Sequence, residues 1–201
     1  MSEVVVLMHV SLDGAVADPS WGRPFRYDGH EKYQLGQVAA SRALLLGRVT
    51  FQEMAAAWPR RDATEEYTGL VDAMPKYVVS TTLEHVAWNG VLIPGQTAEH
   101  IAKLRGEPGQ DLLVLGGAEL VGHLLRLRLV DVLKLCVHPE IAGTGRRLFP
   151  ESGAPGTWTL TGTSVFASGA VVLEYRAQAP APVPTVPRHA RATPANPPPH
   201  P

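Results

Sequence analysis

Apolar positions along the chain follow two spacings that alternate. Continuous apolar runs with the length of buried strands occur at 4–12, 43–49, 76–81, 90–95 and 111–117. Segments with apolar residues at helical spacing lie between them, at 31–42, 50–58 and 97–106. Strands that alternate with helices are typical of an α/β fold built on a parallel sheet. The pattern therefore predicts this class of fold.

The C-terminal part of the pattern is different. Strand-type runs at 130–143 and 157–176 are joined by glycine turns, without a helical segment between them. This arrangement predicts that the last part of the sheet is antiparallel. Further upstream, Thr50 and Glu53 have the spacing of a capping box, which predicts that a helix begins at Thr50.

A change in composition marks the end of the folded part. Nine of the eighteen prolines follow Ala179, in a stretch with almost no large apolar residue. Such a stretch cannot join a core, so we expect one domain over 1–177 and a disordered Pro/Ala-rich tail over 178–201. His189 and His200 lie in this tail without any spacing typical of metal ligands, which favours solvated side chains.

Charge and cysteine content narrow the class of protein. The net charge is −1 and the pI is about 6.7, which argues against binding to nucleic acid or to an acidic membrane surface. Cys136 is the single cysteine, so an intrachain disulfide and a zinc site built from several cysteines are excluded. The N-terminus has neither a basic signal-peptide region nor an apolar run of about 20 residues. We expect a soluble, cytoplasmic protein.

Three of the predicted buried strands end in junctions that are rich in glycine or hydroxyl groups: Gly47–Arg48, Ser80–Thr82 and Gly116–Gly117. Ligands of open α/β sheets bind at the carboxyl ends of the strands. A glycine pair can serve a tight turn alone, or it can let a phosphate approach the backbone at a helix N-terminus. The spacing is neither that of a dinucleotide-binding G-x-G-x-x-G nor that of a P-loop. The neighbouring arginine and hydroxyls favour a pyrophosphate and a further phosphate as ligands.

Five segments of the chain carry a family resemblance. In order, they are VVVLMHVSLDG, ALLLGRVTFQEM, KYVVST, LLVLGGAELVGHLL and VHPEIAGTGRRLFP. Together they resemble the dihydrofolate reductase superfamily, above all its bacterial branch related to the C-terminal reductase domain of bifunctional riboflavin-biosynthesis deaminase/reductases. The resemblance covers roughly residues 3–176. It implies a three-layer α/β fold in which helices flank a central mixed, mostly parallel sheet with an antiparallel C-terminal part.

The resemblance implies an NADPH-dependent reductase of a small nitrogen heterocycle. The pyrimidine branch, which includes 5-amino-6-(5-phosphoribosylamino)uracil reductases, is favoured over true dihydrofolate reductases because their aromatic-Asn-Leu-Pro context is missing here. A deaminase domain is absent, since the chain lacks the His-x-Glu and Pro-Cys-x-x-Cys signatures. The family also implies a homodimer. A noncatalytic NADP-binding sensor or scaffold with the same fold remains an alternative.

The family motifs also imply which residues contact the cofactor. Gly116, Gly117, Ala118 and Glu119 would surround the pyrophosphate, and Gly47, Arg48 and Thr50 would form a second phosphate-facing turn. Arg48, Ser80 and Thr81 would contact the 2′-phosphate, which separates NADPH from NADH. Val10 and Ser11 would form the floor beneath the nicotinamide. Alternatively, Arg48 is a solvated surface residue.

The substrate side has two candidate catalytic carboxylates, Asp13 and Glu31. Asp13 is implied as an acid that faces the substrate, or else it only bonds the backbone of the turn at Gly14. Trp21 and Phe25 would belong to a covering loop, although Trp21 could equally pack in the core. Asp28 is a further residue on the substrate side.

The remaining polar residues in apolar surroundings have open roles. His9 and His138 lie in strand runs and are interpreted as core histidines, and no metal ligand set is predicted. Arg146 and Arg147 could attract a substrate phosphate or be solvated, and their glycine-rich segment 141–150 could close the site or simply turn between strands.

Overall fold

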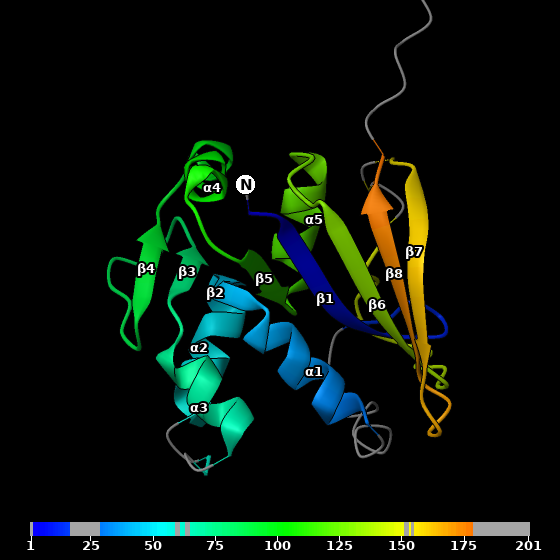
Figure 1. Cartoon of the computed structure of the whole chain (residues 1–201). Coiled ribbons are helices and arrows are strands. Elements are labelled where there is room, and N and C mark those ends of the chain that lie inside the picture. Colours follow the sequence, from blue (N-terminus) through cyan, green and yellow to red (C-terminus); the bar gives the residue numbers. More distant parts are fainter. Residues whose placement is uncertain are drawn as a thin grey trace, which may run out of the picture.

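The computed structural model describes residues 2–16, 29–58, 61–62, 65–150, 153 and 155–178. The described residues form one eight-stranded sheet with the order β4-β3-β2-β5-β1-β6-β8-β7 (Figure 1). Its strands are β1 Val4–Ser11, β2 Ser41–Gly47, β3 Lys76–Val79, β4 Gly90–Ile93, β5 Asp111–Leu115, β6 Val132–His138, β7 Trp158–Val165 and β8 Val171–Ala177. The predicted loop residues Trp21, Phe25 and Asp28 and the predicted tail from 179 onward lie outside the described residues.

Strand directions follow the prediction from the sequence. The pairs β4–β3, β3–β2, β2–β5, β5–β1 and β1–β6 are parallel. The pairs β6–β8 and β8–β7 are antiparallel. The prediction of a mostly parallel sheet with an antiparallel C-terminal part is therefore confirmed.

Helices cover both faces of the sheet and give three layers (Figure 1). They are α1 His30–Ala39, α2 Arg48–Ala57, α3 Glu66–Ala73, α4 Thr97–Gly106 and α5 Ala118–Arg126. Along β1, Val4, Val6 and Met8 belong to the apolar cluster that includes α4 and α5. Val5 and Leu7 belong to the cluster that includes α1, α2 and α3. Successive side chains of β1 thus point to opposite faces of the sheet and pack into two apolar cores, one on each side.

One predicted helix start is wrong. Helix α2 begins at Arg48 and its N-cap is Gly47, with no hydrogen bond from a capping side chain. The capping box predicted from Thr50 and Glu53 does not form, because the chain enters the helix directly after the extended backbone of Gly47, which has φ −80° and ψ 161°. Thr50 therefore lies inside the first turn. Among the described helices, none is long and apolar enough to cross a membrane.

Candidate functional site

A cleft of about 1650 Å³ lies at the carboxyl ends of the parallel strands. Four strands contribute to its lining, through 7–9 on β1, 47–50 at the end of β2, 79–82 at the end of β3 and 115–120 at the end of β5, and helix α1 and Arg146 contribute further residues. Pockets for single drug-sized ligands are about 300–1000 Å³. The cleft is thus large enough for a dinucleotide together with a second small molecule, and it lies where the fold predicts a ligand.

Two helices begin at this cleft, and neither N-terminus is capped by a side chain. The N-cap of α2 is Gly47 and that of α5 is Gly117, and neither helix has a side-chain hydrogen bond at its cap. Both glycines line the cleft. The first N–H groups of an α-helix have no partner within the helix, and its N-terminus carries a partial positive charge. Two such termini in one cleft favour a ligand with negative charge.

The two adjacent glycines between β5 and α5 have different roles. Both have left-handed backbones, with φ +69° at Gly116 and φ +79° at Gly117. A Cβ on Gly117 would lie 3.0 Å from Oγ1 of Thr50, so a side chain at this position would press on Thr50 at the start of α2. A Cβ on Gly116 would have no atom within 4 Å, and this position opens into the cleft. The pair therefore serves the turn and also exposes backbone to a ligand.

The residues predicted to contact the 2′-phosphate all line the cleft. Arg48 is exposed, and its Nη1 donates to Oε1 of Gln52 at 3.1 Å. Ser80 is buried, and its hydroxyl accepts from the N–H groups of Thr82 and Leu83, at 3.2 and 3.1 Å. Ser80 thus holds the turn that presents the exposed Thr81. Arg48 and Thr81 have polar groups that a ligand can reach.

Val10 and Ser11, predicted to form the floor under the nicotinamide, do not line the cleft. Val10 packs in the core on the α4 and α5 side. The hydroxyl of Ser11 donates to Oδ1 of Asp13 at 2.6 Å and accepts from the N–H of Ala15 at 2.9 Å. The residues of β1 that line the cleft are instead Leu7, Met8 and His9, which directly precede Val10 along the strand.

The two candidate carboxylates have different surroundings. Besides Ser11, Asp13 accepts from the N–H groups of Ala142 and Gly143, at 3.0 and 3.1 Å, and pairs with Arg147 at 3.2 Å. The hydrogen bonds from Ser11 and Ala142 lower the pKa of Asp13 to about 2. Asp13 is therefore an anion at neutral pH, outside the residues that line the cleft. These contacts favour the loop role. Glu31, exposed on the first turn of α1, lines the cleft.

The glycine-rich segment 141–150 reaches the cleft through Arg146. Its Nη1 lies 2.7 Å from Oε1 of Glu119, in an exposed ion pair at the start of α5. Both residues line the cleft, whereas Arg147 pairs with Asp13 instead. The sequence left the roles of the two arginines open, because Arg146 is 27 residues from Glu119 along the chain. The structure brings only Arg146 to the cleft.

The two histidines interpreted as core residues differ in exposure. His138 is completely buried, whereas His9 is partly buried and lines the cleft. Sequence reasoning missed His9 as a cleft residue. A signal was present, since a polar residue near the carboxyl end of an otherwise apolar strand lies where ligands of this fold class bind.

Comparison with known proteins identifies the family. Residues 2–172 match the family described as RibD C-terminal domain, and the chain belongs to this family. It is 31% identical over 135 residues to the uncharacterized protein YyaP of Bacillus subtilis, a match that covers 66% of this chain and 72% of the relative. The family confirms the resemblance to riboflavin-biosynthesis reductases.

Solved structures confirm the fold. A protein assigned to riboflavin biosynthesis from Shewanella sp. PV-4 superposes with a TM-score of 0.69 at 22% identity, covering 89% of this chain and 100% of that one. A bifunctional pyrimidine deaminase/reductase of Thermotoga maritima gives 0.64 at 14% identity, covering 88% and 57%. Dihydrofolate reductase of Enterococcus faecalis, solved with NADP(H), gives 0.56 at 17% identity, covering 88% and 97%. The chain has the dihydrofolate-reductase-like fold and belongs to a reductase-like class.

Proposed function

We propose that the protein is an NADPH-dependent reductase of a small nitrogen heterocycle of the aminopyrimidine or pterin type. One observation carries the proposal: two uncapped helix N-termini and an open glycine backbone meet in one large cleft at the carboxyl ends of the strands. Membership in a reductase-like family supports the same reading, as does the named reductase activity of the Thermotoga maritima neighbour.

The cleft residues fit a dinucleotide phosphate. The N–H groups at the start of α5 would bind the pyrophosphate, and the missing side chain at Gly116 leaves room for it to reach the backbone. The guanidinium of Arg48 and the hydroxyl of Thr81 would bind the 2′-phosphate, which gives a preference for NADPH over NADH. The bound cofactor supplies the hydride.

The substrate half of the cleft lies between β1 and α1. Leu7 lines this half from the apolar core on the α1 side of the sheet, and Glu31 and Gln34 add polar groups from α1. A carboxylate accepts hydrogen bonds from the amino and ring N–H groups of an aminopyrimidine, and it can hold a proton close to the acceptor atom. We therefore assign orientation of the substrate and supply of the proton to Glu31. Asp13 would instead anchor the turn after β1 to the segment at 142–143.

The test is a turnover assay with the purified chain. NADPH is incubated with a panel of aminopyrimidines, pterins and quinonoid compounds while the absorbance of the reduced nicotinamide is followed. Oxidation of NADPH that depends on an aminopyrimidine or a pterin is expected, with NADH much less effective. Tight binding of NADPH without turnover of any compound would contradict the reductase and favour a nucleotide sensor. Absence of NADPH binding would overturn the proposal as a whole.

A further inference from the structure

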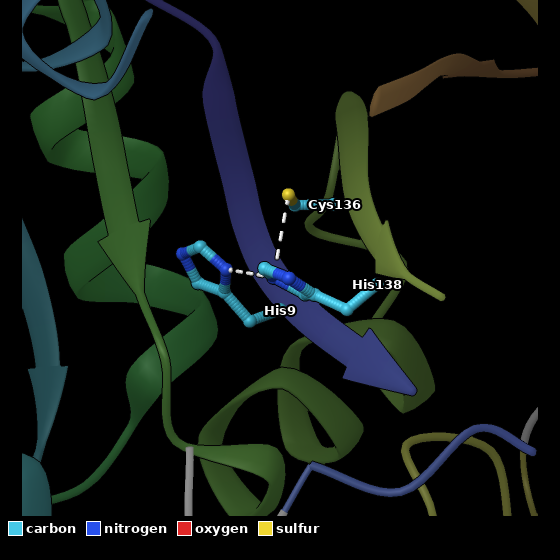
Figure 2. A group of neighbouring side chains, drawn as sticks. All are labelled: His9, Cys136 and His138. Atoms are coloured by element: carbon cyan, nitrogen blue, oxygen red, sulfur yellow. Dashed lines mark hydrogen bonds between the residues drawn. The ribbon is translucent and has the colours of Figure 1, made fainter. Parts of the chain in front are cut away.

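Three side chains with metal-binding atoms meet on one face of the sheet, next to the cleft. His9 lies on β1, and Cys136 and His138 lie on the adjacent parallel strand β6. In the register of these strands His9 is opposite Cys136, and His138 follows two residues later. Positions opposite each other and two apart project to the same face. Figure 2 shows the two imidazoles and the sulfur directed toward one another.

The distances approach those of a coordination shell. Nδ1 of His9 lies 2.8 Å from Nε2 of His138, and Sγ of Cys136 lies 3.5 Å from the same nitrogen. All the candidate ligand atoms lie within 4.8 Å of one another. Around a tetrahedral Zn²⁺, nitrogen ligands are about 3.3 Å apart, and nitrogen and sulfur are about 3.5 Å apart. Small rotations of the side chains, with shifts of roughly 1 Å, would bring the three ligand atoms to these separations.

The surroundings of His9 provide the support that metal-binding histidines usually have. Its second ring nitrogen, Nε2, lies 2.7 Å from the side-chain amide of Gln34 on α1. Histidine ligands typically donate the N–H of the free nitrogen to an outer acceptor, which fixes the ring. With Nδ1 on an ion, Nε2 would donate to the amide oxygen of Gln34 after a half-turn of the amide group. The ring of His30 covers the cluster, with its centroid 4.8 Å from that of His9.

We propose that His9, Cys136 and His138 bind a Zn²⁺ ion, with the thiol of Cys136 releasing its proton to become the thiolate ligand. Two imidazoles and one thiolate form a ligand set that suits this ion. Cys136 and His138 are fully buried, whereas His9 lines the cleft. None of the three proposed ligands has a role in the reductase proposed above, so the two proposals can fail separately.

The experiment replaces Zn²⁺ by Co²⁺, whose bond to a thiolate gives a charge-transfer absorption band. Cys136 is the single cysteine, so this band reports on this site alone, whatever the tail histidines do. Titration of the full reduced chain with Co²⁺ should produce the band with one equivalent bound, and Zn²⁺ should abolish it. Absence of the band, or a band that Zn²⁺ does not displace, would overturn the proposal.

Single substitutions test the three ligands. Cys136→Ser should remove the band, and His9→Gln and His138→Gln should weaken Co²⁺ binding at least tenfold. His100→Gln is the matched control, because His100 lies on α4 away from the cluster and the cleft, and it should bind like the wild type. The His9→Gln variant should fold, because His9 is only partly buried, so a loss of Co²⁺ binding in this variant reports on the site and not on misfolding. A folded His9→Gln protein, verified by circular dichroism, that binds Co²⁺ as tightly as the wild type would refute the site.

Discussion

Substitution of Gly116 separates the role of the glycine pair in the turn from its role in binding. Gly116→Ala places a methyl group where no protein atom lies within 4 Å, so the fold has room for it. The backbone, with φ +69°, adds strain of about 1–2 kcal/mol for any residue with a Cβ. For a domain of this size, that strain lowers the melting temperature by roughly 2–8 °C. The protein should stay folded.

Binding should suffer far more than folding. The added methyl group occupies the space through which a phosphate reaches the N–H groups of α5, and loss of one charge-assisted hydrogen bond costs about 1.5–3 kcal/mol. Titration calorimetry should therefore give an NADPH Kd that is raised on the order of 10- to 100-fold. Gly143→Ala is the matched control, since Gly143 has the same φ of +69° and equally open space, but does not line the cleft. Equal NADPH affinities for the two variants would refute the reasoning.

Four further perturbations test the contact to the 2′-phosphate, the proton donor, the turn at Asp13 and the C-terminal tail. Arg48→Ala should weaken NADPH by about 1.5–3 kcal/mol and leave NADH unchanged in binding titrations, and equal losses would exclude the 2′-phosphate contact. Glu31→Gln should lower turnover at least tenfold without changing the NADPH Kd, because proton transfer is worth about 10²–10⁴ in rate. Asp13→Asn should lower the melting temperature at pH 7, because the ionised carboxyl of Asp13 stabilises the fold through the contacts that lower its pKa. The difference in melting temperature from the wild type should shrink as the pH falls from 3.8 toward 2, since the carboxyl is then protonated. Deletion of the chain after Ala179 should change neither melting temperature nor NADPH affinity, and a clear drop in either would show that the tail packs on the domain.

Local patterns in the sequence sufficed for much of the fold. Runs of apolar residues located the buried strands, and glycines between strand and helix located the turns of the cleft. The carboxyl ends of parallel strands lie at one edge of the sheet, so Gly47, Ser80 and Gly116 could be brought together before the structure was known. Helix α3 was missed, because a short helix with only Thr68 and Val71 buried has a weak apolar pattern.

Features that depend on contacts between distant segments could not be predicted. Asp13 meets the backbone at Ala142, and His9 meets His138, each across 129 residues of the chain. Neither contact leaves a local pattern, because each depends on the register of β1 against β6 and on the loops that follow these strands. The place of Val10 and Ser11 outside the lining of the cleft depends on the same packing. A strand that is buried on both faces has a continuous apolar run, so its local sequence does not show which of its residues reach the cleft.

A crystal structure of the chain with bound NADPH would show directly whether the cleft is the cofactor site. The pyrophosphate oxygens are expected to accept hydrogen bonds from the backbone N–H groups at the start of α5, beside Gly116 and Gly117. The 2′-phosphate is expected within hydrogen-bond distance of Arg48. A cofactor bound elsewhere, or a cleft that stays empty at saturating NADPH, would refute the proposed NADPH site.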